Sequence, residues 1–382
     1  MPARSHQKLL RNSKSHYRMP AEWEPHEATW IAWPHNQEDW PGKFEPIAWV
    51  YAEIVRNLSR HERVEIIVND APAGKPARKS LERANAFNGN VRFHRCPTDR
   101  VWTRDSGCTF VKSGGGDATA NTSQPSLARP DSRGSMSLRD SLVAMCWRFN
   151  AWAKYSNWRK DQKVAGFMGG IAGASELEPA FGKKRVVLEG GSIDVNGQGT
   201  LLTTEECLLG KTQQRNPGMK RSDYERVFAQ YLGITNVVWL KSGIAGDDTH
   251  GHVDDITRFV TPDTVVSVIE SDPNDVNYEP LRENIRRLRA ASDQNGHELA
   301  IIELPMPRPI FFENRRLPAS YANFYIANAI VLVPMFNDPA DRIALDALAD
   351  VFPDREVVGI YCGDLIWGFG AIHCMTQQQP AT

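Results

Sequence analysis

The hydrophobic residues follow two kinds of periodic pattern along the chain. Apolar residues recur at helical spacing in Pro46–Leu58 and Ser222–Leu232. Short β-rich runs such as Val64–Val68 and Asn236–Leu240 end at polar residues. Because the two kinds of segment alternate, the pattern predicts an α/β fold. Further short apolar runs of the strand type are Thr29–Trp33, Val91–His94, Arg185–Leu188, Gly199–Thr203, Arg258–Val260, Val265–Val268, Leu299–Leu304, Tyr325–Val333 and Glu356–Tyr361, and further helical runs are Ser80–Phe87, Tyr278–Ala290 and Arg342–Val351.

Two segments interrupt this alternation of strand-like and helix-like runs. Residues 112–140 are rich in Gly, Ser, Thr, Asn, Pro and Arg, which predicts a flexible surface insertion. Residues 1–18 are basic and polar without an apolar stretch, so they predict a flexible N-terminal tail, with a mitochondrial presequence as the alternative. The length of 382 residues suits either one large repeat-built domain or two to three ordinary domains.

Composition narrows the classes of function. The formal net charge is -1, which argues against a general electrostatic binder of nucleic acid. No run of about 18 apolar residues occurs, so no membrane span is expected. The six cysteines form no CxxC pair, which favours a reduced protein over a disulfide scaffold or a zinc knuckle. We therefore expect a cytoplasmic protein.

Four polar or glycine-rich segments follow strand-like runs, where loops on a rigid scaffold often carry function. Trp102–Gly107 holds an Arg–Asp pair, which would also suit a surface ion pair beside a turn. Leu188–Ser192 has a carboxylate before two glycines, which suits either a turn or a close backbone approach. Gly246–Asp254 contains His-x-His-x-Asp, and Ile366–Gln379 holds a cysteine after several glycines.

The last two segments suggest different chemistries. On one face of a strand, His250, His252 and Asp254 could offer three ligands to zinc, although a fourth would still be needed. Alternatively Cys374 acts as a nucleophile and needs a base. His373 does not suit that role, because neighbours in a strand point to opposite faces. His252 is therefore the best candidate for the base, and a buried structural cysteine near a fraying C-terminus is the plain alternative.

The chain resembles the agmatine deiminase family, which is close to the bacterial peptidylarginine deiminases in the guanidino-modifying, or pentein, superfamily. The resemblance runs from about Met19 to Pro380, and residues 112–140 are the main unmatched piece. Its motifs occur in the family's order. They are Met19–Trp30, Trp33-Pro34, Trp102–Gly107, Phe149–Trp152, Leu188–Ser192, Leu201–Leu208, Gly251–Asp254 and Ile372–Gln378.

This resemblance implies a fold and a set of residue roles. Residues 19–382 would form a single catalytic domain, a pentein α/β-propeller of five ββαβ-like units around a pseudo-fivefold axis. The active site would lie in its central channel. The implied site residues are Cys374 as nucleophile, His252 as general acid/base, Asp105 and Asp254 as carboxylates that hold the guanidinium, Glu189 as the acid beside the histidine and substrate, and Trp102 as a wall of the pocket.

Such a residue set suits hydrolysis of a guanidinium. Carboxylates accept its N–H groups in fixed geometry, and a cysteine thiolate attacks its central carbon. The histidine protonates the departing ammonia, and water then releases a ureido product from a covalent thiouronium. The resemblance implies agmatine as substrate and N-carbamoylputrescine as product, without a metal or an organic cofactor. It also implies a homodimer or larger homo-oligomer, and no nucleic-acid or membrane partner is expected.

Three places depart from the family's pattern. Cys108 stands where the family commonly has proline, and His250 stands where it has Asn. Phe369 and Ala371 interrupt a common run of three glycines. The candidate catalytic side chains all remain, so the substrate is more open than the reaction. Free arginine or a C-terminal peptidyl-arginine is the alternative substrate, and a non-catalytic pentein-fold binding protein is the alternative of another class.

Overall fold

The computed structural model describes residues 16–114 and 141–382 of the chain. Strands and helices alternate in these residues, so the predicted α/β class is confirmed. The strands form five sheets of three or four strands and two hairpins, β8 (Ala180–Phe181) with β9 (Lys184–Arg185) and β16 (Phe311–Phe312) with β17 (Arg315–Arg316). In the order of their pairing, the larger sheets are β1 (Tyr17–Arg18), β5 (Thr109–Ser113), β6 (Ser141–Met145) and β7 (Ser175–Leu177); β10 (Asp194–Val195), β11 (Thr200–Thr204) and β12 (Asn236–Leu240); β13 (Thr257–Phe259), β14 (Thr264–Ile269) and β15 (Ala300–Pro305); β18 (Tyr325–Ile326), β19 (Ile330–Met335) and β20 (Glu356–Tyr361); and β21 (Gln377–Pro380), β2 (His26–Ala32), β3 (Arg63–Val68) and β4 (Val91–Arg95).

The five larger sheets share one pairing pattern. Each has an antiparallel pair followed by a parallel pair, as in β13 against β14 and β14 beside β15. Parallel neighbours need a crossover, which α8 (Tyr278–Arg289) provides between β14 and β15 and α9 (Ala340–Val351) between β19 and β20. The other helices are α2 (Phe44–Leu58), α3 (Ala71–Arg83), α4 (Thr103–Ser106), α5 (Val164–Ala172), α6 (Glu205–Leu209), α7 (Arg221–Leu232) and α10 (Ile372–Met375), with 3-10 helices η1 (Gln37–Asp39), η2 (Ala151–Ala153), η3 (Asp161–Lys163), η4 (Gly190–Ser192), η5 (Val253–Asp255) and η6 (Leu365–Gly368).

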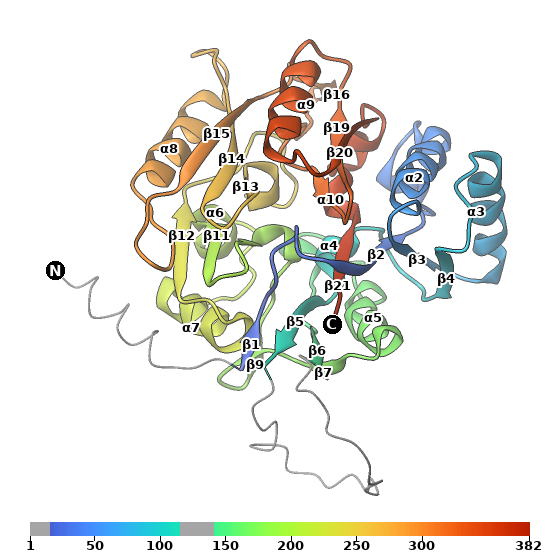
Figure 1. The fold of residues 1–382 in the computed structure, drawn as a ribbon, viewed down its shortest axis with the longest axis horizontal. Helices are drawn as coiled ribbons and strands as arrows, with labels where there is room; N and C mark the ends of the chain where they lie inside the picture. Colours follow the sequence, from blue (N-terminus) through green and yellow to red (C-terminus); the bar gives the residue numbers. More distant parts are fainter. Residues whose placement is uncertain (1–15, 115–140) are drawn as a thin grey trace, which may run out of the picture.

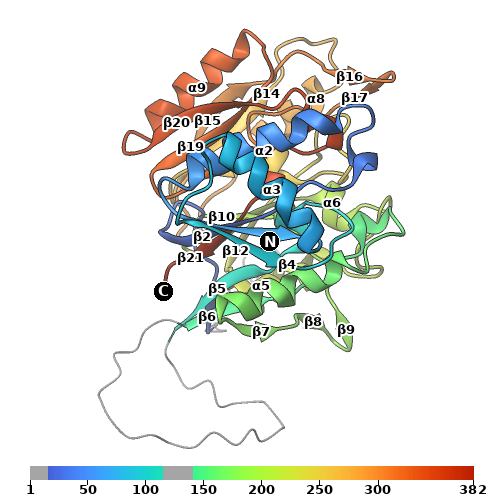
Figure 2. The same ribbon diagram turned by 90° about the vertical axis from the view of Figure 1, so that its right-hand side faces the viewer.

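The long helices cover the sheets from outside. Figure 1 shows α2, α3, α8 and α9 toward the periphery, whereas the short α4 and α10 lie nearer the middle. Figure 2 shows α2 and α3 across the sheet of β2, β3 and β4, which both helices contact. The helix α2 illustrates the cause, because its buried residues Ile47, Val50, Tyr51, Ile54 and Leu58 recur every three or four positions. Burying each such side chain contributes about 1.5–3 kcal/mol.

The C-terminal segment belongs to the core. The strand β21 pairs antiparallel with β2 and so joins the last residues to the first long strand. Gln377, Gln378 and Gln379 are buried there, and Trp30 Nε1 donates to Gln379 Oε1 at 2.9 Å. This anchoring fixes α10, which carries Cys374. The C-terminus therefore does not fray, and this part of the alternative, a structural cysteine near a fraying C-terminus, is wrong.

One predicted helix is misplaced. Of the predicted segment Ser80–Phe87, only Ser80–Arg83 is helical, as the last turn of α3, which begins at Ala71 and ends at Arg83. Pro72, Gly74 and Pro76 hid its first turns from the sequence pattern. Proline in the first turn costs no hydrogen bond, because that N–H would have no partner in any case. Asp70 caps the helix by accepting a hydrogen bond from Ala73 N at 2.7 Å.

Other predicted boundaries also change. The predicted strand Arg185–Leu188 is only partly a strand, since β9 ends at Arg185 and Val187 forms one isolated bridge. Tyr325–Val333 is two strands, β18 and β19. Of the predicted tail and insertion, residues 1–15 and 115–140 lie outside the described residues. Tyr17 and Arg18 form β1 and pair with Ser113 and Lys112 of β5, so the ordered fold includes one edge of each segment.

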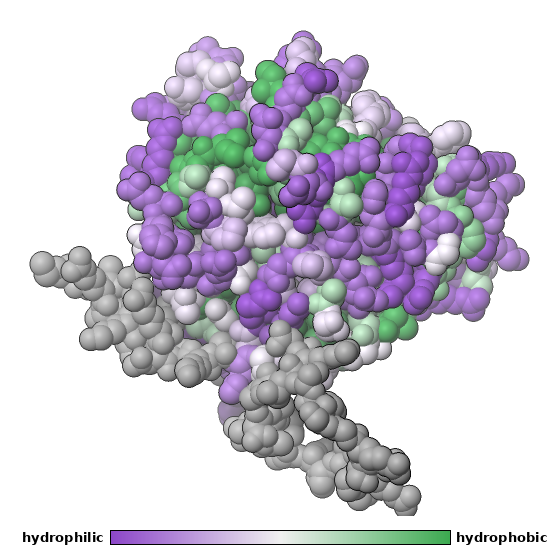
Figure 3. Space-filling view, in the orientation of Figure 1, coloured by the Kyte–Doolittle hydropathy of each residue, from purple (hydrophilic) through white to green (hydrophobic). Residues whose placement is uncertain are grey.

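The face drawn in Figure 3 is largely hydrophilic, and hydrophobic residues gather in its upper half, over the region of β14, β15 and β19. Large side chains that are individually exposed, such as Trp49 and Val276, are ordinary on a protein surface. Across residues 16–114 and 141–382, no helix combines the length and the apolar character that a bilayer crossing requires.

Candidate active site

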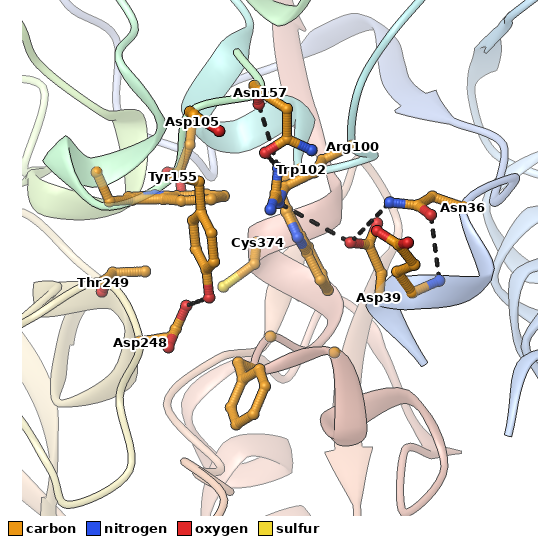
Figure 4. A pocket seen from close by; sticks show the side chains of 16 residues that line it. Asn36, Asp39, Arg100, Trp102, Asp105, Tyr155, Asn157, Asp248, Thr249 and Cys374 are labelled. Atoms are coloured by element: carbon orange, nitrogen blue, oxygen red, sulfur yellow. Dashed lines mark hydrogen bonds and ion pairs between the residues drawn. The ribbon is translucent and has the colours of Figure 1, made fainter. Parts of the chain in front are cut away.

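A cavity of about 420 Å³ is lined by residues from distant parts of the chain. Three of the predicted site residues, Trp102, Asp105 and Cys374, line it. Figure 4 shows the Cys374 sulfur in the space between Trp102 and Tyr155. The cysteine comes from α10 and Asp105 from α4, two short helices that contact each other.

Glu189, His252 and Asp254 lie behind the cavity wall and are fully buried. His252 Nδ1 lies 3.8 Å from Asp105 Oδ1 and 3.9 Å from Asp254 Oδ1, and Nε2 lies 3.8 Å from Glu189 Oε2. Neither ring nitrogen has a hydrogen-bond partner in the part of the chain that the structure describes. Cys374 Sγ lies 3.7 Å from Asp254 Oδ2. The five predicted catalytic side chains therefore form one cluster.

Two glycines make this close packing possible. A Cβ on Gly191 would lie 2.5 Å from His252 Nδ1, 2.9 Å from Asp254 Oδ2 and 3.0 Å from Asp105 Oδ1. A Cβ on Gly190 would lie 2.3 Å from a backbone carbonyl oxygen. Gly191 N also donates to Asp105 Oδ1 at 3.0 Å. The functional interpretation of the glycine pair, a close backbone approach, is thus confirmed.

Two carboxylates are held in place by neighbouring residues. Trp152 Nε1 donates to Asp105 Oδ2 at 2.8 Å, and Arg215 Nε donates to Glu189 Oε1 at 3.1 Å. Burial opposes ionisation of Glu189, but Arg215 and His252 lower its pKa to about 2. Trp152 belongs to a motif that the sequence already offered. Nothing in the sequence pattern singled out Arg215.

Burial and crowded carboxylates shift the ionisation of the reactive groups. Burial raises the pKa of Cys374 well above its usual range, and Asp254 and Asp255 raise it further. Burial also raises the pKa of Asp105 to about 6, against the effect of His252. For His252, burial opposes the charged form, but Asp105 and other neighbours raise its pKa well above the usual value. These shifts favour a neutral thiol and a protonated histidine.

His373 connects two buried carboxylates. Its Nδ1 lies 2.7 Å from Asp254 Oδ2, and its Nε2 lies 2.8 Å from Glu22 Oε2. Two buried arginines, Arg104 and Arg258, also lie within 3.1 Å of Glu22 carboxylate oxygens. His373 and the next residue are in a short helix and not in a strand, so both side chains reach Asp254. The argument from strand geometry that set His373 aside is therefore wrong.

His250 does not join the cluster. Its φ is 66°, and the following residues form η5 with His252 as N-cap, so the predicted strand face of His-x-His-x-Asp does not exist. His250 Nδ1 lies 3.7 Å from Glu206 Oε1 instead. Within the described ranges, two groups of side chains have ligand atoms close enough to share a metal ion, and neither contains His250. They are Glu189, Cys207 and His252, and Asp254, Asp255 and Cys374.

Phe369 lines the cavity and does not pack away from it. Its ring lies 4.0 Å from the guanidinium carbon of Arg315. Arg315 Nη2 in turn donates to Asp248 Oδ1 at 2.5 Å, and Asp248 also pairs with Lys154. Figure 4 shows Asp248 beside Tyr155, across the sulfur from Trp102. The bulk of Phe369 is thus fixed at one wall of the cavity.

Several known proteins are similar to this chain in sequence and in fold. Residues 18–380 match the sequence profile of the Porphyromonas-type peptidyl-arginine deiminase family. The agmatine deiminases of Pseudomonas aeruginosa strain LESB58 and of Ectopseudomonas mendocina are each 34% identical to the chain, with 96% of both chains covered. The solved agmatine deiminase of Enterococcus faecalis has a TM-score of 0.81 at 29% identity, over 96% of each chain. A cysteine-to-serine variant of C. jejuni agmatine deiminase, solved with substrate bound, has a TM-score of 0.77 at 26% identity, over 95% of this chain and 96% of that one.

Proposed function

The chain belongs to the Porphyromonas-type peptidyl-arginine deiminase family, and we propose that it hydrolyses agmatine to N-carbamoylputrescine and ammonia. Agmatine deiminase is the activity named for relatives that match almost the whole chain. The observation that carries the proposal is a buried histidine among three carboxylates beside a cysteine that lines a cavity. A site with this excess of carboxylates suits a cationic, planar substrate.

Asp105 and Asp254 hold the guanidinium. Carboxylates accept pairs of guanidinium N–H groups, and Asp254 Oδ1 has no hydrogen-bond partner in the described part of the chain. Trp152 and His373 already fix the two carboxylates, so these side chains lose little conformational freedom when the substrate binds. Trp102 offers the cation an aromatic wall.

Substrate binding activates the nucleophile. The bound cation offsets the carboxylates that raise the pKa of Cys374, so the thiol loses its proton to solvent as the substrate binds and the thiolate forms. The sulfur attacks the central carbon, and one electron pair of the guanidinium moves to nitrogen in a tetrahedral adduct. Protonated His252 gives its proton to a terminal amine, the carbon–nitrogen bond breaks, and ammonia leaves.

Hydrolysis then returns the enzyme to its starting state. Neutral His252 takes a proton from water as the oxygen attacks the thiouronium carbon. The carbon–sulfur bond breaks, the ureido product leaves, and the thiolate of Cys374 takes a proton back from solvent. Glu189, held by Arg215, keeps the imidazole oriented and stabilises its charged form. One water is consumed for each ammonia released.

The five larger sheets form five ββαβ-like units around a pseudo-fivefold axis in this proposal. Support comes from the repeated antiparallel-then-parallel pairing with a helical crossover. In Figure 1 the sheets follow one another around the middle of the molecule in chain order. The helices α4 and α10 would then place Asp105 and Cys374 at the central channel.

One observation favours free arginine or a C-terminal peptidyl-arginine as a second candidate. Arg100 lines the cavity, and its cation could bind a substrate carboxylate that agmatine lacks. Arg100 is already engaged, however, because it stacks on Tyr155 at 4.2 Å and donates to Asn157 Oδ1 at 2.8 Å. It also lies 3.8 Å from Asp39. These contacts leave agmatine as the first choice.

Parallel incubation with agmatine, free arginine and an arginine-ended peptide tests the function. Ammonia and ureido product are both measured, and we expect turnover of agmatine alone, lost in Cys374→Ala. Turnover of arginine or of the peptide in its place would keep the reaction and overturn the substrate. Absence of turnover with a folded wild-type protein would favour a binding protein. A homodimer, checked by light scattering, and a cytoplasmic location stay predictions.

A further inference from the structure

We infer that Asn323 is a further catalytic residue that donates a hydrogen bond to the thiolate of Cys374, an inference that rests on the proposed role of this cysteine as nucleophile. Asn323 lies in the loop between β17 and β18 and is 1% exposed. Its Nδ2 atom donates to Cys374 Sγ at 3.1 Å. No sequence motif singled out this residue, because the contact joins positions that are 51 residues apart.

All four hydrogen-bonding positions of the Asn323 amide are used. Besides the sulfur, Nδ2 donates to Asp255 Oδ1 at 2.9 Å. Oδ1 accepts from His373 N at 3.0 Å and from Cys374 N at 3.3 Å. The opposite amide orientation would set Nδ2 against two N–H donors and Oδ1 against a carboxylate. The partners therefore fix an N–H group toward the sulfur.

The sulfur needs such a donor. Asp254, Asp255 and Asp105 all disfavour a negative charge on Cys374. In residues 16–114 and 141–382, the Asn323 amide is the one group that donates a hydrogen bond to this sulfur. A hydrogen bond to an ionised group typically shifts an equilibrium by roughly tenfold to hundredfold. This N–H thus stabilises the attacking thiolate in the presence of the carboxylates that bind the substrate.

The loop around Asn323 is itself held in place. Ser320 Oγ donates to the Asp255 carbonyl at 2.7 Å, and Asn323 O accepts from His373 N at 3.1 Å. These bonds join the loop to η5 and to the start of α10, and all four residues are buried. Asn323 therefore also supports the backbone of the nucleophile. An experiment has to separate this structural contribution from the effect on the sulfur.

Alkylation of Cys374 by iodoacetamide, measured against pH and located by peptide mapping, separates them. Asn323→Asp keeps the shape of the side chain but presents oxygen to the sulfur, and Asn323→Ala removes the amide. We expect the apparent pKa of Cys374 to rise in both variants and to rise most in Asn323→Asp. The alkylation rate at neutral pH should fall about tenfold to hundredfold.

Asn284→Ala is the matched control. Asn284 is also a buried asparagine whose amide accepts from a backbone N–H, that of Lys241, and donates to a backbone carbonyl, that of Ser242. It should lose comparable stability and keep the wild-type alkylation profile. An unchanged profile in folded Asn323→Asp would overturn the inference, even if agmatine is turned over normally. A shifted profile without turnover of agmatine by the wild type would instead overturn the proposed substrate and leave the role at the sulfur.

Discussion

Two buried histidines lie on either side of Asp254, and their surroundings differ. Both ring nitrogens of His252 lie 3.8–3.9 Å from carboxylates and have no hydrogen-bond partner in the described residues. Both ring nitrogens of His373 are within 2.8 Å of a carboxylate oxygen. The pKa values of its partners Asp254 and Glu22 are lowered, against the effect of burial, in part by this histidine.

In the proposed mechanism, this difference in surroundings distinguishes His252, which transfers protons, from His373, which stabilises the structure. A histidine whose two nitrogens both lie within hydrogen-bond distance of a buried carboxylate is fixed in place, and removing it would leave both carboxylates without that partner. His252 instead interacts electrostatically with carboxylates beyond hydrogen-bond distance. These carboxylates favour its charged form, and neither ring proton is held in a hydrogen bond with them. Replacing the two histidines should therefore change different quantities.

The largest effect on catalysis should follow from His252→Asn. The variant lacks the group that we propose as the acid for the leaving ammonia and the base for water, so we expect kcat for agmatine to fall by about 10²–10⁴-fold. The ring lies 3.8–3.9 Å from its carboxylates and has no hydrogen bond to lose in the described residues, so the urea midpoint of unfolding should fall less than when His373 is replaced. Steady-state assays and urea titration measure the two quantities. A variant that keeps a tenth of wild-type kcat would contradict the assignment.

His373→Asn should chiefly reduce stability. It breaks two buried charge-assisted contacts and leaves Asp254 and Glu22 facing each other without their shared partner. We expect the free energy of unfolding to fall by roughly 3–5 kcal/mol, measured by urea denaturation. His297→Asn is the control, because His297 also pairs with a carboxylate but its side chain is 74% exposed. A loss that is no greater than in this control would remove the contrast between the two histidines.

Gly191→Ala tests how tightly the His252 side of the site is packed. The added methyl group would overlap His252, Asp254 and Asp105, so these side chains must move. Proton transfer and substrate binding both depend on their positions, and we expect kcat/KM to fall at least about tenfold. Gly89→Ala, where a Cβ meets nothing within 4 Å, should retain wild-type kcat/KM. Equal activity of the two variants would show that the cluster is looser than the distances indicate.

The same contrast separates what the sequence could predict from what it could not. Asp105, Glu189, His252, Asp254 and Cys374 lie in segments of distinctive composition, and the structure brings all five together. Most of the long β and α segments also followed from local periodicity, but α5 was not predicted, prolines in α3 disguised its first turns, and two predicted strands have other bounds. Their proposed arrangement as five units came from resemblance and not from periodicity.

Tertiary contacts set the remaining features. Arg215 and Asn323 come from loops whose sequences carry no periodic or motif signal, and Glu22 lies in the Met19–Trp30 motif but had no expected role. Each matters because folding brings it against one site residue from a distant part of the chain. His373 was misjudged because a strand was assumed where a single helical turn forms. Local sequence patterns indicate which residues are buried and which backbone conformation they adopt. The contacts between distant residues depend on how the sheets are arranged in the folded protein.

The pH dependence of kcat/KM tests the carboxylate that faces His252. Burial raises the pKa of Asp105 from 3.8 to about 6, and its charged form holds the guanidinium, so kcat/KM should rise with pH through about 6. Trp152→Phe removes a hydrogen bond that favours the charged form. The Asp105 pKa should then rise, and the acid limb should move up by about one pH unit. An acid limb that stays in place would show that another group controls it.

The smallest effect is expected at the histidine that the sequence pattern first grouped with the site. His250 has a positive φ, is partly exposed and lies nearest to Glu206, so neither the carboxylates nor the sulfur depends on it. His250→Asn keeps a residue type that tolerates this backbone conformation. We expect kcat and KM for agmatine to stay within about twofold of wild type, because substitutions away from buried networks usually change stability by less than about 0.5 kcal/mol. A tenfold loss of kcat, with KM unchanged, would instead draw His250 into the proton transfer and weaken the assignment of His252 as the sole acid/base.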